Sequence, residues 1–166
     1  MEKINQLIYR MTEYFSGDPK RIQHFMKVYA YSVLIAKGEN VDDALLETLQ
    51  AAAVVHDIGI HAAEEKYGSC SGKLQEKEGP PLARAILAEV GYSSECIERV
   101  AYLVGHHHTY DKIDGMDYQI LVEADFIVNM YEDNLSKAAI QKACQSVFAT
   151  NSGKKLCRDI FAIDIP

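Results

Sequence analysis

Apolar residues recur every three or four positions along most of the chain, which is the spacing of one face of an α-helix. No segment shows the strict alternation of apolar and polar residues that is typical of a half-buried strand. The pattern therefore predicts an all-α fold. The predicted helices cover, in approximate terms, residues 4–15, 19–38, 42–57, 80–90, 94–106, 117–128 and 136–148, with one further short helix after residue 153.

Residues with strong positional preferences mark several of the predicted helix starts. Asp18 followed by Pro19 is typical of an N-cap and a first helical position. We expect Pro80 and Pro81 to begin another helix, because proline is tolerated in the first turn and breaks a helix further on. Asp117 is expected to cap the helix that follows it.

Residues 60–79 are polar, include Gly68, Gly72 and Gly79, and show no sustained period. We predict a long surface loop here, which could act as a lid. Loops of this length in a compact domain are more often functional than idle.

Length and composition limit the class of protein. A chain of 166 residues with 48% hydrophobic content can form one ordinary core, so residues 1–166 are expected to fold as a compact single-domain bundle of about six to eight helices. The net charge of −7 argues against duplex nucleic acid as a partner, because an acidic surface repels phosphates. No apolar run approaches the ~18 residues that cross a bilayer, so we expect no membrane association.

The four cysteines are widely separated and form no C-x-x-C pair, which argues against a zinc knuckle or a secreted disulfide framework. We interpret Cys70, Cys96, Cys144 and Cys157 as reduced thiols. The amino-terminal segment also lacks the uninterrupted apolar stretch of a signal peptide. These features favour a cytoplasmic location.

Four residues on three predicted helices have the side chains of a metal site. His24 lies on the second helix, the doublet His56-Asp57 follows the apolar run AAAVV at the end of the third, and Asp125 lies among apolar residues of the sixth. A carboxylate in apolar surroundings costs several kcal/mol unless a cation accompanies it. Two imidazoles with two carboxylates suit a divalent transition metal, namely Fe, Mn, Zn, Co or Ni, better than Ca or Mg.

This order of residues, a histidine, a His-Asp doublet and a distant aspartate on separate helices, resembles the HD superfamily of metal-dependent phosphohydrolases. Arg21, three residues before His24, and the stretch LVEADFIVN around Asp125 add to the resemblance. It covers about residues 19–133, so residues 134–166 would form a C-terminal helical extension. The resemblance implies an all-α HD-like fold and a catalytic metal.

Two-metal members of this family have further histidines between the doublet and the last aspartate. One lies in a stretch like HPxxGAxIL, but the matching GPPLARAIL has Gly79 at the histidine position, and the preceding Glu78 could supply an oxygen ligand instead. The second histidine of the family falls within the run of residues 106–108, where the family spacing favours His107 and then His106. The resemblance thus implies one ion, with two as the alternative.

Each of these residues also has a structural interpretation. A histidine such as His24 is often a satisfied core residue, and Asp57 alone could belong to a helix-terminal turn. Histidines at a helix C-terminus are also favoured there by the helix dipole, which would leave His106 and His107 as a solvated helix end. Arg21 could bind a substrate phosphate or pair with a neighbouring acid.

The function implied is a metal-dependent phosphohydrolase. A bound divalent ion lowers the pKa of its water from about 15.7 to about 7 and polarises a phosphoryl oxygen. In this hypothesis Asp57 is both metal ligand and the residue that orients the water. The substrate would be a nucleotide or other small phosphoester, cleaved as a monoester or diester, and the oligomeric state is left open. The alternatives are a nucleotide-sensing module with a structural or absent metal, and a di-iron oxygenase.

Overall fold

The computed structural model describes residues 2–164, and these residues form helices and connecting turns without a strand. The all-α prediction is therefore confirmed. Nine helices lie within the described residues: α1 (Lys3–Tyr14), α2 (Pro19–Gly38), α3 (Asp43–Val55), α4 (Ile60–Tyr67), α5 (Gly72–Val90), α6 (Ser94–Val104), α7 (Met116–Glu132), α8 (Lys137–Val147) and α9 (Asn151–Phe161).

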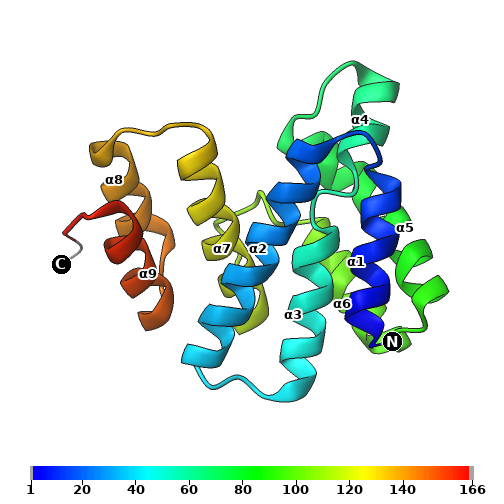
Figure 1. The fold of residues 1–166 in the computed structure, drawn as a ribbon, viewed down its shortest axis with the longest axis horizontal. Helices are drawn as coiled ribbons and strands as arrows, with labels where there is room; N and C mark the ends of the chain where they lie inside the picture. Colours follow the sequence, from blue (N-terminus) through cyan, green and yellow to red (C-terminus); the bar gives the residue numbers. More distant parts are fainter. Residues whose placement is uncertain (1, 165–166) are drawn as a thin grey trace.

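The helices α2, α3 and α7 form the centre of the molecule. Helix α2 packs against both α3 and α7, and α5 packs against α6. Figure 1 shows α8 and α9 beside α7 on one side, and α1, α4, α5 and α6 on the other. The alanines of the AAAVV run, Ala51, Ala52 and Ala53, are fully buried, which allows neighbouring helices to approach α3 closely.

The prediction of a loop over residues 60–79 is wrong. Helix α4 covers Ile60–Tyr67, and α5 begins at Gly72, so only a short turn separates them. Apart from Ile60, the buried positions of this region are Ala63, Gln75 and Gly79, which are small or polar. Burial by such residues leaves no apolar period for the sequence to show.

The expected helix start at Pro80 and Pro81 is also wrong, because both prolines lie inside α5. A proline removes one backbone donor and crowds the preceding turn, so packing must stabilise the helix at this point. Helix α5 packs against α4, α6 and α1. Tertiary contacts therefore override the local preference.

Two smaller expectations differ from the structure as well. Helix α7 begins at Met116 with Gly115 as its N-cap, so Asp117 lies in the first turn, where its carboxylate accepts hydrogen bonds from Arg99 at 2.7 Å. Cys144 of α8 and Cys157 of α9 are joined by a disulfide, so the interpretation of all four cysteines as reduced thiols is wrong for these two.

A buried carboxylate fixes the C-terminal pair of helices. Glu123 of α7 is fully buried and accepts hydrogen bonds from the backbone N–H groups of Ala149 and Thr150, at 2.7 and 2.9 Å. Its other oxygen accepts from the Thr150 hydroxyl at 2.5 Å, while Thr150 caps α9. These bonds anchor the start of α9 on the central helix.

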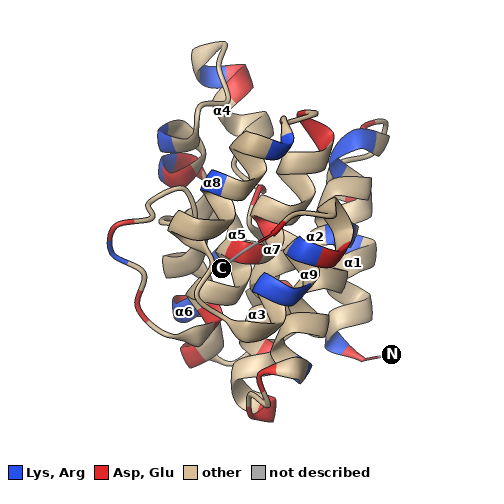
Figure 2. Cartoon of the chain, turned by 90° about the vertical axis from the view of Figure 1, so that its left-hand side faces the viewer, with Lys and Arg blue, Asp and Glu red and all other residues tan. Residues whose placement is uncertain are grey.

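Charged positions of both signs alternate over the side of the molecule drawn in Figure 2. On that side Lys and Arg form no continuous basic stripe. None of the helices formed by residues 2–164 is long and apolar enough to cross a lipid bilayer.

Candidate metal centre

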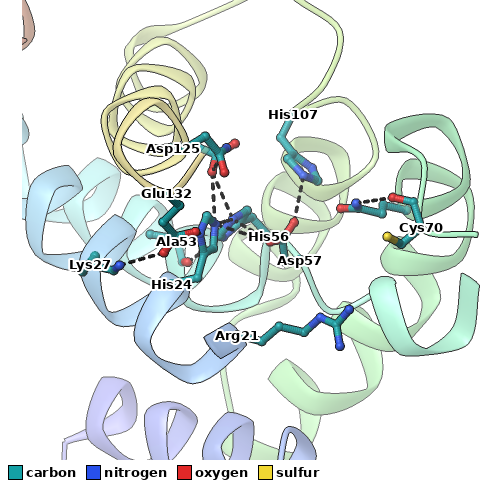
Figure 3. A network of polar contacts seen from close by, with 12 residues as sticks. Arg21, His24, Lys27, Ala53, His56, Asp57, Cys70, His107, Asp125 and Glu132 are labelled. Atoms are coloured by element: carbon teal, nitrogen blue, oxygen red, sulfur yellow. Dashed lines mark hydrogen bonds and ion pairs between the residues drawn. The ribbon is translucent and has the colours of Figure 1, made fainter. Parts of the chain in front are cut away.

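Five side chains from four parts of the chain converge at the end of the central helices. His24 projects from α2, His56 and Asp57 follow the last turn of α3, Asp125 projects from α7, and His107 follows α6 (Figure 3). His24, His56, Asp125 and His107 are buried, and Asp57 is partly buried. We call His24, His56, Asp57 and Asp125 the first group. The run AAAVV buries the end of α3 and so places the doublet inside the protein.

Donor atoms of four of these residues lie at nearly equal separations. The Nε2 of His24 is 3.2 Å from the Nε2 of His56, 3.2 Å from Asp125 Oδ1 and 3.4 Å from Asp57 Oδ2. The Nε2 of His56 is 3.4 Å from Asp57 Oδ2 and 3.6 Å from Asp125 Oδ1. Neighbouring donors at about 2.1 Å from one metal ion stand about 3.0 to 3.4 Å apart, and the three separations from His24 fall in this range. Ligand atoms of His24, His56 and Asp57 all lie within 4.8 Å of one another, and Asp125 faces the Nε2 atoms of both histidines.

The histidine rings are held so that Nε2 faces the centre. His56 Nδ1 lies 2.9 Å from the carbonyl oxygen of Ala53, and His107 Nδ1 lies 2.9 Å from that of Val104. A carbonyl oxygen only accepts, so each Nδ1 carries a proton, and Nε2 is the ring nitrogen left to bind a metal ion. The Nε2 of His107 is buried without a hydrogen-bond partner among the described residues, which is an unsatisfied position that a cation would fill.

Electrostatics keep both carboxylates ionised. Burial raises the pKa of the Asp125 carboxyl, but the adjacent imidazoles of His24 and His56 lower it by more, so its pKa lies below the ordinary value. The same holds for Asp57: burial raises its pKa, but the imidazoles of His56 and His107 lower it by more, and its pKa is well below the ordinary value. Ionised carboxylates beside imidazoles are the ligand form of both residue types.

A second group of potential ligands shares Asp57 with the first. Asp57, His107 and His108 each offer one ligand atom, and these atoms lie within 4.8 Å of one another. Asp57 Oδ1 is 3.4 Å from His107 Nε2, whereas Oδ2 faces His24. Burial, with a smaller effect from His107, lowers the pKa of His108 to about 4, so this imidazole is neutral at neutral pH. The two oxygens of one carboxylate thus face two groups of imidazoles.

Sequence reasoning did not select His108. The triple histidine is visible in the sequence, but the spacing argument singled out its first two members. The ring of His108 lies 3.2 Å from the Oε1 of Gln75, one turn before Gly79 on α5. This contact depends on the N-terminal extension of α5, which the sequence pattern does not show.

His106 and Glu78 lie outside both groups. The ring of His106 stacks on Tyr102, and its Nδ1 lies 2.7 Å from the carbonyl oxygen of Tyr102. Glu78 accepts hydrogen bonds from Lys66 at 3.1 Å and from the Tyr67 hydroxyl at 2.7 Å. The structure therefore does not bring either side chain to the candidate centre.

Gly79 lies at a close crossing of two segments. A Cβ atom at this position would lie 2.6 Å from Val104 Cγ1, and one at Gly59 would lie 2.8 Å from the backbone nitrogen of Gly79. Neither contact is tolerated by real Cβ atoms, so a histidine has no room at position 79 in this packing.

A cavity of about 460 Å³ opens over the first group, and His24, Asp57 and Asp125 are among its lining residues. Arg21 also lines it, but its guanidinium pairs with Asp18 and, at 2.6 Å, with Glu64. A substrate phosphate at Arg21 would have to compete with these two carboxylates.

Comparisons with known proteins agree with this arrangement. The family model described as "HD domain" matches residues 21–147. The 3'3'-cGAMP-specific phosphodiesterase 3 of Vibrio cholerae serotype O1 is 31% identical over 115 residues, which are 66% of this chain and 24% of that protein. The chain therefore matches about a quarter of the length of this curated relative.

A solved structure shares the fold. The crystal structure of a predicted HD superfamily hydrolase from an uncultured Thermotogales bacterium superposes with a TM-score of 0.68, over 95% of this chain and 84% of the other, at 23% sequence identity. At this level of identity the likeness concerns the fold.

Proposed function

Because the chain belongs to the HD-domain family, we propose that it is a metal-dependent phosphohydrolase that acts on a nucleotide or other small phosphoester. One observation supports this most directly: the donor atoms of three buried residues and of the partly buried Asp57 stand 3.2 to 3.6 Å apart in the pairs that involve His24 or His56. The three buried residues are His24, His56 and Asp125. The chain holds an Fe, Mn, Zn, Co or Ni ion with these four residues. A divalent ion of this kind supplies an acidified water and polarises a phosphoryl oxygen.

The side chains around this centre have separate tasks in the proposal. His24, His56 and Asp125 hold the ion, and their burial keeps bulk water from competing for it. Asp57 uses Oδ2 toward this group and has Oδ1 free to orient a water or a phosphate oxygen on the side of His107. His107 and His108, with Asp57, form the place for a second ion. Without a second ion, His107 would stabilise the developing phosphate charge only with a proton on Nε2 as well as on Nδ1.

The cavity supports a small substrate. Its volume of about 460 Å³ falls within the usual range for small-molecule sites of about 300 to 1,000 Å³. The printed name of the Vibrio relative favours a phosphodiester, and a cyclic dinucleotide in particular, as the first substrate to try.

Two measurements on one preparation test the proposal. Protein purified without chelator is analysed for metal content. Release of p-nitrophenol is followed with p-nitrophenyl phosphate and bis(p-nitrophenyl) phosphate, release of phosphate with nucleoside monophosphates, and formation of linear or mononucleotide products with 3'3'-cGAMP. We expect bound transition metal and turnover of at least one class, which also distinguishes a monoesterase from a diesterase. Tight nucleotide binding without turnover would instead favour the sensing module, and oxygen consumption the oxygenase.

An active-site variant makes the assay specific. Asp57→Asn should reduce turnover by more than about 100-fold, because loss of a shared ligand should exceed the 10- to 100-fold effect of losing an outer partner. The exposed Asp159, paired with Lys155 on α9, provides the matched control Asp159→Asn. Turnover by Asp57→Asn within a few-fold of the control would contradict the assignment.

A further inference from the structure

Both ring nitrogens of His24, which lies on α2, face carboxylates of one other helix, α7. Its Nε2 lies 3.2 Å from Asp125 Oδ1, and its Nδ1 lies 2.9 Å from Glu132 Oε2. Asp125 and Glu132 are seven positions apart on α7, which is close to two turns and places both on one face. Figure 3 shows Glu132 beside His24 with Lys27 next to it.

Lys27 holds the other oxygen of this carboxylate. Its Nζ lies 2.7 Å from Glu132 Oε1, and Lys27 follows His24 by three positions on α2, so the two side chains share a helix face. The Glu132 side chain is 16% exposed, against 38% for Lys27. Glu132 is therefore largely withdrawn from water and bonded at each oxygen.

This arrangement sets His24 apart from the other two histidines that face the centre. His56 and His107 each donate from Nδ1 to a backbone carbonyl of their own turn. His24 lies in mid-helix, where the carbonyls are used by the helix itself, and its Nδ1 faces an ionised carboxylate from another helix. A carboxylate makes a stronger, charge-assisted hydrogen bond than a carbonyl.

We propose that Glu132 is a positioning residue for the metal centre: it keeps the proton of His24 on Nδ1, so that Nε2 presents its lone pair to the ion, and Lys27 fixes Glu132 in that place. The inference rests on the proposed role of His24 as a metal ligand. Without an acceptor at Nδ1, the ring loses its fixed orientation and populates the tautomer in which Nε2 carries the proton and cannot bind a metal.

The competing explanation is an ordinary ion pair between Lys27 and Glu132 that has no effect on His24. Partly exposed pairs of this kind contribute little to stability. Under that explanation, removal of either partner would change the free energy of unfolding slightly and leave metal affinity as it is.

Metal affinity and the hydrogen bond at Nδ1 of His24 separate the two explanations. We would measure the dissociation constant for Mn²⁺ or Zn²⁺ by competition with a chromophoric chelator, and the Nδ1–H signal of His24 by ¹H–¹⁵N NMR of the Zn²⁺-loaded protein. The variants are Glu132→Met, which keeps the length of the side chain without an acceptor, Glu132→Gln, which keeps an acceptor without the charge, and Lys27→Met. Glu98→Met is the matched control, because Glu98 pairs with Arg84 on the outer faces of α5 and α6.

We expect Glu132→Met to weaken metal binding about 10- to 100-fold, Glu132→Gln to restore much of the loss, and Lys27→Met to fall between Glu132→Gln and the wild type. In the Zn²⁺-loaded wild type, the NMR spectrum should show a slowly exchanging Nδ1–H of His24, and Glu132→Met should broaden or remove this signal. Equal affinity and an unchanged Nδ1–H signal in Glu132→Met and Glu98→Met would overturn the inference.

The same data keep this inference distinct from the proposed function. Glu132-dependent metal binding without release of phosphate or nucleotide would overturn the hydrolase and leave the role of Glu132 standing. Turnover by the wild type, together with unchanged metal affinity in Glu132→Met, would overturn the role of Glu132 and leave the hydrolase standing. A wild-type protein that binds no transition metal would overturn both.

Discussion

The two oxygens of Asp57 face different partners, and this explains why one residue can belong to two groups of ligands. Oδ2 lies 3.4 Å from the Nε2 atoms of His24 and His56, and Oδ1 lies 3.4 Å from that of His107. Its position directly after His56, at the end of α3, points the two neighbouring side chains into the same buried space. The His-Asp doublet thus connects the groups.

The triple histidine gives a prediction at the residue scale. If the centre holds two ions, His107→Ala should lower the number of bound ions by one, because the Nε2 of His107 faces Asp57. If it holds one ion, the same change should lower turnover at constant metal content. His106→Ala should leave metal content and turnover as in the wild type, since the His106 ring stacks on Tyr102 and bonds its carbonyl oxygen. Elemental analysis and steady-state kinetics measure both quantities.

The outcome also tests the role of residues 106–108, which follow α6. If neither His107→Ala nor His108→Ala changed metal content or kinetics, these two side chains would have only a structural role after the helix. Loss of metal in His106→Ala alone would contradict the packing of His106 against Tyr102.

At the scale of the helices, the sequence predicts best where burial uses large apolar residues. The first group of candidate ligands is found from the sequence because His24, the doublet and Asp125 interrupt strong apolar patterns of helices that the structure confirms. The segment that forms α4 and the first part of α5 is not found. Its buried face includes Ala63, Gln75 and Gly79, so its pairing with the rest of the fold is a tertiary effect.

The crossing of α5 and α6 at Gly79 gives a prediction for this packing. Gly79→Ala should lower the free energy of unfolding by about 1 to 2 kcal/mol, because its methyl group would lie 2.6 Å from Cγ1 of Val104, a side chain with a stiff χ1 in a helix. In a Val104→Ala background the loss should be smaller, because the Cγ1 atom that the new methyl group meets is gone, whereas its contact with the ring of Pro80 remains.

Urea unfolding of the four proteins in this double-mutant cycle measures the coupling. If Gly79→Ala lowered the free energy of unfolding equally with and without Val104→Ala, the Val104 side chain would not limit the space at position 79. Close packing against Val104 would then not explain why this position has no histidine.

The connection between α8 and α9 gives a second prediction at this scale. The structure joins Cys144 to Cys157, leaves Cys70 exposed and buries Cys96. Burial also raises the pKa of the Cys96 thiol, which slows its reaction further. With a chromogenic disulfide reagent, the folded, non-reduced protein should therefore show one fast-reacting thiol. The non-reduced protein in denaturant should show two thiols, and the reduced protein in denaturant should show four. Three or more thiols in denaturant without reductant would contradict the disulfide.

At the scale of the whole molecule, the candidate ligands bring together parts of the chain that are far apart in sequence. His24 on α2 and Asp125 on α7 are separated by a hundred positions, and Asp57 lies between them at the end of α3. These three helices pack against one another at the centre of the fold. An ion bound by all of them is bound only by the folded chain, so its binding energy adds to the free energy of unfolding.

Metal binding should therefore raise the melting temperature. At a free metal concentration about 100 times the dissociation constant, the gain is about 2.7 kcal/mol, which for a chain of this size corresponds to about 5 to 11 °C. A chelator should remove the shift, and His24→Ala should abolish it. His61→Ala is the matched control and should retain it, because the His61 ring packs against Tyr14 and Phe15, its Nε2 lies 3.5 Å from Asp18, and it belongs to neither group of potential ligands. Differential scanning calorimetry with Mn, Fe, Co, Ni and Zn measures the effect, and an unchanged melting temperature with all five ions would contradict a metal that connects α2, α3 and α7.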